Sequence, residues 1–315
     1  MNWRLKSAIQ RFCAGLPVGS DSVYYRLQRH FGSLRNPPPP NMLLEGAASF
    51  CEWLRAAGLP LRGRRCMEVG TGRRTDLPFG LYLLGAAGTH TFDLTRYLRL
   101  ELVEFTLFCM RRDRRHYEEI FLGAAEDPDE TRQRISTLLG AANAREAMRI
   151  AGIQYRAPED ATKTGLPDGS IDLHLSYTVN EHIPRPVLCG ILKEAKRVLS
   201  PTGVVLHHID PSDHFAHDDP SISSINFLRF SEAEWQHHGG NKYAYHNRMR
   251  THEHHELFEQ CGYQILREQT WTDERALNEL RNGFPLAPEF QRFTQEELAG
   301  AVIRILARPE DPSQP

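Results

Sequence analysis

The order of apolar and polar positions along the chain predicts helices that alternate with strands. Residues 43–57 place apolar side chains at helical spacing and end at a Gly-Leu-Pro stop. A short apolar strand at 66–70 then enters a glycine turn, and an apolar helix-like run at 77–87 leads to a second strand at 89–94. Such alternation is typical of a parallel sheet covered by helices.

The same alternation continues to the end of the chain. Strands are expected at 153–157, 171–177 and 203–210, with a helix of one apolar face at 186–199 between the last two. Two further strands, Tyr263 to Arg267 and Ala301 to Ala307, complete the set. We therefore predict an α/β fold with a Rossmann-like, doubly wound, mostly parallel seven-stranded sheet.

Segments outside this alternation predict the domain organisation. Residues 1–62, which include four consecutive prolines, are expected to be a helical N-terminal extension and linker before a domain at 63–310. About sixty residues separate the second and third strands, more than a simple crossover needs, so a helical hairpin is inserted at about 97–150 with the acidic turn 125–130 between its two helices. Residues 211–260 are expected on the ligand side of the sheet, and 311–315 as a disordered tail.

Charge and cysteine content narrow the possible partners. The formal net charge of -2 argues against nucleic acid, and the arginines between 111 and 115 are followed by Glu118 and Glu119, which favours a solvated, compensated helix face. Six scattered cysteines without metal-ligand spacing predict reduced thiols. No apolar run is long enough to cross a bilayer, and no export signal is recognisable. We expect a soluble, cytoplasmic protein without a membrane partner, and the oligomeric state stays open.

The strongest chemical signal is the turn Glu68-Val69-Gly70-Thr71-Gly72 after the first strand. Glycines there allow the backbone to approach a ligand closely. A carboxylate two residues before Gly70 attracts a cationic ligand group and would repel the pyrophosphate of a dinucleotide. Asp93, at the end of the second strand, is placed to accept the hydroxyls of a ribose.

Two more segments, LPDGSIDLHLSYTVNEHIP (166–184) and ILKEAKRVLSPTGVVL (191–206), occur in the expected order after EVGTG. Together these stretches resemble the class I methyltransferases that use S-adenosylmethionine (SAM), in particular the bacterial small-molecule type, over about residues 64–210. The resemblance departs at Arg74, where many members have another glycine. It implies SAM as the cofactor, bound by Glu68, Gly70, Thr71, Gly72, Asp93, Leu94, Asp160, Ala161, Ser176 and Tyr177.

Residues just after the fourth and fifth strands are best placed to act on a substrate. The resemblance places His182 near the transferred methyl, although a histidine at a helix start can also simply bond to backbone. Alternation along the fifth strand predicts that His208 and Asp210 share a face, opposite His207, and a His-Asp pair can act as a general base. The candidate catalytic residues are therefore His182, His208, Asp210 and His214.

Two other interpretations of this histidine-rich stretch stay open. Mixed histidine and carboxylate ligands can hold a divalent metal, whereas charged loops of this kind are often only solvated; no metal site is predicted. For the whole chain we predict methyl transfer from SAM to an oxygen or nitrogen of a small-molecule acceptor by direct displacement. The alternatives are a non-catalytic SAM-binding regulatory module and an NAD-dependent oxidoreductase, which would share the glycine turn and Asp93.

Overall fold

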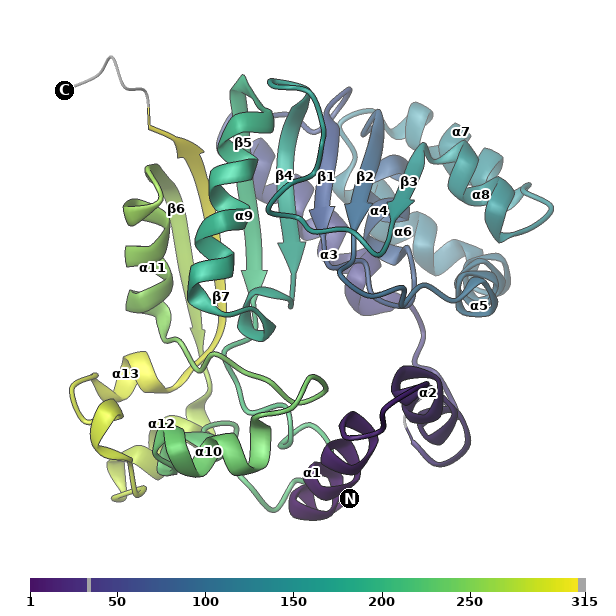
Figure 1. Cartoon of the computed structure of the whole chain (residues 1–315). Helices are drawn as coiled ribbons and strands as arrows, with labels where there is room; N and C mark the ends of the chain where they lie inside the picture. Colours follow the sequence, from purple (N-terminus) through teal and green to yellow (C-terminus); the bar gives the residue numbers. More distant parts are fainter. Residues whose placement is uncertain (33–34, 311–315) are drawn as a thin grey trace.

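The computed structural model describes residues 1–32 and 35–310, so the predicted disordered tail at 311–315 lies outside it. Within the described residues there is one seven-stranded sheet in the order β3-β2-β1-β4-β5-β7-β6 (Figure 1). Strands β1 to β5 pair in parallel, and β7 runs antiparallel to both β5 and β6. The predicted fold class is confirmed. The strands are β1 Arg65–Val69, β2 Gly88–Phe92, β3 Ile153–Arg156, β4 Ile171–Tyr177, β5 Leu199–Ile209, β6 Tyr263–Thr272 and β7 Gly300–Pro309.

Both faces of the sheet are covered by helices. On one face, α3 (Asn41–Ala56) and α4 (Asp76–Leu83) share a buried core with β1, β4 and β5. On the other face, α9 (Arg185–Val198) and α11 (Thr251–Gln260) bury a second core against the opposite side of the same strands. The central strands are therefore buried on both sides, and β4 carries polar residues, His174 and Ser176, at buried positions between its apolar ones.

The insertion between β2 and β3 contains four helices, and the predicted two-helix hairpin is wrong. They are α5 (Leu100–Arg112), α6 (Arg114–Ala124), α7 (Pro128–Leu139) and α8 (Ala144–Ile150). The acidic turn does separate α6 from α7, where Asp127 caps the first turn by accepting from the backbone of Glu130. Asn143 caps α8 in the same way, which is a second start signal inside the predicted second helix. All four helices contribute to the core of the α3 face.

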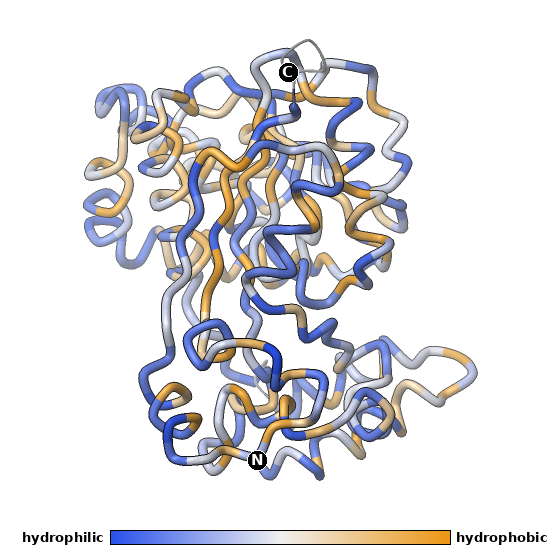
Figure 2. Tube along the Cα trace, turned by 90° about the vertical axis from the view of Figure 1, so that its left-hand side faces the viewer, coloured by the Kyte–Doolittle hydropathy of each residue, from blue (hydrophilic) through white to orange (hydrophobic). Residues whose placement is uncertain are grey.

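A third layer lies beyond the carboxyl ends of the parallel strands, below their arrowheads in Figure 1. It consists of α1 (Trp3–Ala14), α2 (Ser20–Phe31), α10 (Glu232–Gly239), α12 (Glu274–Arg281) and α13 (Gln295–Leu298), with the short helices η2 (Asn226–Arg229) and η3 (Pro288–Phe290). Figure 2 shows apolar stretches in this layer as well as in the sheet body. They form a separate core around Trp3, Phe227 and Trp235.

The surface features follow the sequence pattern. Arg114 and Arg115 each form an ion pair one turn along α6, with Glu118 and Glu119 respectively, as expected for a compensated helix face. Across residues 1–32 and 35–310, no helix combines the length and the apolar character that crossing a membrane requires. All six cysteines are free thiols.

Candidate functional site

The backbone turns sharply where β1 ends. Gly70 and Gly72 have φ angles of +86° and +69°, a region that residues with a Cβ rarely adopt. A Cβ at Gly70 would stand 2.5 Å from the side chain of Val179, in the loop after β4. At Gly72 a Cβ would meet nothing within 4 Å. The turn is therefore pressed against the β4 loop at its first glycine and open at its second.

Asp93 lies beside this turn, directly after β2. Its Oδ1 accepts from the backbone N–H of Gly72 at 3.3 Å, and its Oδ2 accepts from the hydroxyl of Tyr155 at 3.0 Å. That hydroxyl accepts in turn from the backbone N–H of Tyr97 at 3.1 Å, so its direction is fixed. Burial raises the pKa of Asp93 to about 6. Tyr155 was not predicted, although the parallel pairing of β2 with β3 is the signal that places it near Asp93.

Glu68 is a second buried carboxylate at the turn. It is 4% exposed, and its Oε2 accepts from the hydroxyl of Thr91 at 2.5 Å. The hydroxyl of Thr71 bonds to the same Thr91 oxygen. Burial raises the pKa of Glu68 to about 8, because the charged form loses its hydration there.

The two arginines that follow the turn are engaged elsewhere. Arg73 donates to the side chain of Gln28 on α2 at 2.5 Å. Arg74 pairs with Asp76 at 2.9 Å and donates to the carbonyl of Pro38. The acidic groups of the turn are therefore not neutralised by its own cations.

The predicted adenine-side residues follow β3. The backbone N–H of Glu159 donates to the carbonyl of Asp93 at 3.0 Å, which holds this segment beside the end of β2. The carboxylate of Asp160 accepts from the backbone of Thr162, and Ala161 is buried in the core of the α9 face. Leu94 is 77% exposed. Their roles in cofactor binding stay predictions.

Ser176 begins a buried chain of polar side chains at the end of β4. It donates to Oδ1 of Asn180 at 3.0 Å, and Nδ2 of Asn180 donates to Nδ1 of His207 at 2.7 Å. The other ring nitrogen of His207 lies 3.0 Å from Nδ1 of His174. Burial lowers the pKa of His174 to about 4, so this chain holds neutral imidazoles near neutrality.

Tyr177 and His208 occupy the opposite face. Their rings stack at 4.1 Å with an interplanar angle of 9°. Nδ1 of His208 accepts from Arg304 at 3.1 Å, and Arg304 also donates to Ser49 on α3. Desolvation lowers the pKa of His208 to about 4, with the cation of Arg304 acting in the same direction. The prediction that His207 and His208 face opposite ways is confirmed.

Asp210 has different partners from the one expected. Its Oδ2 lies 3.2 Å from Nε2 of His214 and 3.5 Å from Nε2 of His217, and its Oδ1 accepts from the backbone of Ser212. The structure therefore corrects the predicted pairing with His208. The physical reason is that β5 ends one residue before Asp210, so strand alternation no longer fixes its direction. Burial would raise the pKa of Asp210, but His214 and Ser212 hold it well below its usual range.

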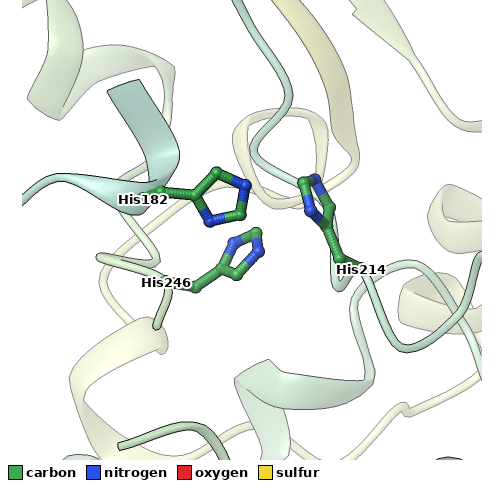
Figure 3. A group of neighbouring side chains, drawn as sticks. All are labelled: His182, His214 and His246. Carbon is green, nitrogen blue, oxygen red and sulfur yellow. The ribbon is translucent and has the colours of Figure 1, made fainter. Parts of the chain in front are cut away.

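Three histidines converge from separate segments (Figure 3). His182 ends the short helix η1 (Asn180–His182), His214 lies in the loop after β5, and His246 precedes α11. Their ring centroids are 4.2 to 4.8 Å apart in every pair. His182 also donates from Nδ1 to the carbonyl of Tyr245 at 2.9 Å, the backbone bond considered as its alternative role. His246 was not predicted, because nothing in its sequence position relates it to residues 32 positions earlier.

A cavity of about 350 Å³ lies next to Asp210, and none of the three histidines lines it. Asp210 and His217 form part of its wall, together with Ser224, Asp273 and Arg275. Its size is within the range of small-molecule sites, and its wall is polar at several points.

Comparison with known proteins is consistent with this arrangement. Residues 134–207 match the family model described as a methyltransferase domain. The matched segment runs from α7 through β3, β4 and α9 into β5, and so does not include the glycine turn. No match was found among curated protein sequences.

Solved structures of methyltransferases are similar to the chain at low identity. Magnesium protoporphyrin IX methyltransferase from Synechocystis, solved with bound SAH, is 11% identical with a TM-score of 0.46, covering 97% of this chain and 99% of that one. An S-adenosylmethionine-dependent methyltransferase from Mesorhizobium loti is 17% identical with a TM-score of 0.43, covering 84% and 99%. The match to the methyltransferase-domain family thus covers residues 134–207, and this segment lies within the seven-stranded, mostly parallel sheet.

Proposed function

We propose that the protein is an enzyme that transfers the methyl group of SAM to an oxygen or nitrogen of a small-molecule acceptor. The acceptor atom attacks the sulfonium methyl, the bond from sulfur to methyl carbon breaks, and S-adenosylhomocysteine leaves. One observation carries the proposal: two buried carboxylates, Glu68 and Asp93, flank a left-handed glycine turn at the end of β1. An arriving cation favours the ionised form of these buried acids, whereas a pyrophosphate would oppose it, so the turn favours a cationic amino acid over a dinucleotide.

The residues of the turn fit SAM in chemical terms. Glu68 would face the cationic methionine end, and Asp93, oriented by Tyr155, would accept the ribose hydroxyls. The open space at Gly72 allows a ligand to approach the backbone. Leu94, Asp160 and Ala161 are assigned to the adenine end, and Ser176 and Tyr177 to the side that faces the acceptor. SAM brings an activated methyl group, so the protein mainly supplies alignment.

We assign the acceptor to the side of the site beyond β4 and β5. His182, Asp210 and His214 gather there, and Asp210 also lines a cavity large enough for a small molecule. The Asp210–His214 pair is the group best placed to take a proton from an acceptor. His208, held between Tyr177 and Arg304, is assigned a positioning role in place of the base role. We also propose that the protein acts in the cytoplasm.

Calorimetry tests the cofactor directly. We expect SAM to bind the wild-type protein and NADH not to bind. Asp93→Ala should abolish SAM binding, because it removes the group assigned to the ribose, whereas Asp129→Ala, an exposed acid on α7, should leave it unchanged. Binding of NADH without binding of SAM would replace the proposal with the oxidoreductase.

Turnover is tested by incubating the protein with methyl-labelled SAM and a fractionated metabolite extract. We expect label to appear in a small molecule of the extract, which identifies the acceptor. SAM binding without transfer to any fraction would favour the non-catalytic regulatory module.

A further inference from the structure

We infer that His182, His214 and His246 form a binding site for a divalent transition-metal ion, with Zn²⁺ the best match. The three rings come from η1, from the loop after β5 and from the loop before α11 (Figure 3). One ligand nitrogen from each ring lies within 4.8 Å of the other two. Three imidazoles with an open fourth position are a common arrangement in catalytic zinc sites.

The ring geometry fits convergence on one point. The planes of the three pairs meet at 72°, 77° and 79°, so no two of these rings are stacked on each other. Nitrogens bound to zinc at 2.0–2.1 Å in a tetrahedron stand about 3.4 Å apart. The observed spacing therefore needs only side-chain adjustment to reach that of a bound ion.

The hydrogen bonding of His182 favours metal ligation. Its Nδ1 carries the proton that is donated to the carbonyl of Tyr245, which leaves the lone pair of Nε2 free. Imidazoles that bind metals almost always donate their other N–H in this way, and the bond fixes both tautomer and ring orientation.

Several buried polar atoms of this cluster have no partner. His246 is 7% exposed, yet its Nε2 has no hydrogen bond. Glu181 is 1% exposed, both its carboxylate oxygens are without a hydrogen bond, and one lies 3.9 Å from Nε2 of His214. Unpaired buried polar groups cost about 1–3 kcal/mol each, so a cation here would satisfy atoms that the protein leaves unpaired.

Backbone contacts hold two of the three segments together. The side chain of Asn247 donates to the carbonyls of Asn180 and Ile183 at 2.7 and 2.9 Å, and its N–H donates to the carbonyl of Glu181. The segment of His246 is therefore fastened to that of His182 before any ligand binds. Ligands held in advance in this way bind a metal without much loss of freedom.

A second group, Asp210, His214 and His217, shares one histidine with this site. We favour the three-imidazole site because it includes the buried His246, whose Nε2 has no hydrogen bond, whereas Asp210 already accepts from Ser212. With the ion bound by the three imidazoles, Asp210 would lie next to it, and His214 would serve as a ligand in place of the base role proposed above.

Metal binding is measured on the full-length protein, first freed of metal by a chelator. We expect one equivalent of Zn²⁺ by calorimetry and a visible absorption band from Co²⁺ in a tetrahedral site. His182→Ala and His246→Ala should each weaken Zn²⁺ binding by more than roughly tenfold, since even loss of an outer partner costs 10–100-fold. His214→Ala should have the same effect. His182 is the most exposed of the three, so His182→Ala is the variant least prone to misfold, and circular dichroism checks each fold.

Two control variants separate the possible outcomes. His217→Ala and His237→Ala should retain the Zn²⁺ affinity and the Co²⁺ band. The inference fails if the wild type binds no Zn²⁺, or if His217→Ala removes binding while His182→Ala does not. Calorimetry with SAM on the metal-free protein distinguishes failure of this inference from failure of the proposed function. If SAM binds but Zn²⁺ does not, only the metal site is wrong. If Zn²⁺ binds but SAM does not, only the proposed methyl transfer is wrong.

Discussion

Glu68 carries its proton in the folded protein at a pH where an exposed carboxylate would be ionised. Burial lifts its pKa from an ordinary 4.5 to about 8. Between these two values the folded state binds more protons than the unfolded state, so this group lowers stability as pH rises through that window. The same burial makes Glu68 sensitive to the arrival of a cation, which would favour its ionised form.

Glu68→Gln should therefore flatten the pH dependence of stability. We expect the Tm of the wild type to fall more than that of the variant between about pH 5 and pH 8, at about 1.4 kcal/mol for each unit of pKa shift. Thermal unfolding in a series of buffers measures this. The exposed Glu119→Gln serves as control and should track the wild type. Parallel curves for wild type and Glu68→Gln would show that Glu68 is ionised in the folded protein.

The same residue connects stability with cofactor binding. If Glu68 meets the ammonium group of SAM, binding at pH 7 should release a proton from its carboxyl, because the cation lowers the raised pKa. Calorimetry in two buffers of different ionisation enthalpy detects that proton. Fewer protons should be released when SAM binds Glu68→Gln. Equal proton release by the wild type and the variant would mean that the ammonium group of SAM does not contact Glu68.

At this scale the sequence identifies residues better than it identifies their partners. Glu68 and Asp93 could be predicted because each stands at a fixed offset from a strand end. The contact of Asp210 with His214 could not, because Asp210 lies beyond β5, where the period of two no longer applies. His246 is brought to His182 by a loop with no period at all.

Among the elements, the turn after β1 and the loop after β4 depend on each other. Val179 fills the space beside Gly70 that a side chain would need. His182 lies three residues after Val179, so a displacement of this loop would reach the acceptor side of the site as well.

Gly70→Ala should cost more than a change of backbone strain alone. Gly58→Ala is the matched control, because Gly58 has a φ of +73° with nothing within 4 Å of a Cβ, so its cost should be about 1–2 kcal/mol. At Gly70 the added Cβ would also meet Val179 at 2.5 Å, and SAM binding should weaken. Chemical unfolding and calorimetry measure both effects. The double variant Gly70→Ala/Val179→Ala should recover part of the loss, and a cost at Gly70 no larger than at Gly58 would contradict this contact.

Element order was predictable where apolar periods are strong, as in β4 and α9. The helices of the insertion were harder to predict, because the apolar spacing continues across the end of α7 and makes α7 and α8 look like one helix. Only the caps Asp127 and Asn143 mark the true starts. The helices α12 and α13 had no counterpart in the prediction, since both are short and largely polar.

The whole molecule has a core outside the sheet. Trp3, 3% exposed, packs against Phe215 and Phe230, and its backbone N–H donates to Asp219 at 2.8 Å. Lys6 pairs with Asp218 at 2.6 Å. The first helix is thus part of the layer that carries His214, although α1 and the residues it contacts there are more than 200 positions apart in the sequence.

Trp3→Ala should loosen that layer and spare the sheet. Truncation of a buried aromatic residue costs about 3–5 kcal/mol, and here the loss falls on contacts within residues 211–250. Limited proteolysis with mass spectrometry should find the first new cuts there, while SAM binding at the turn persists. Phe12→Ala, at a 70% exposed position of the same helix, should behave as wild type. First cuts within the sheet strands instead would mean that the two cores unfold together.

The distance along the chain between α1 and its partners has a consequence for biosynthesis. Ser7 donates to the carbonyl of His238, 231 residues later. At the usual 5–20 residues per second of synthesis, α1 would wait on the order of 10–50 seconds for that partner to emerge. During this interval α2 can pack on α1, but the ring of Trp3 lacks its partners Phe215, Phe230 and His238, so this indole is an early apolar binding site for chaperones on the nascent polypeptide.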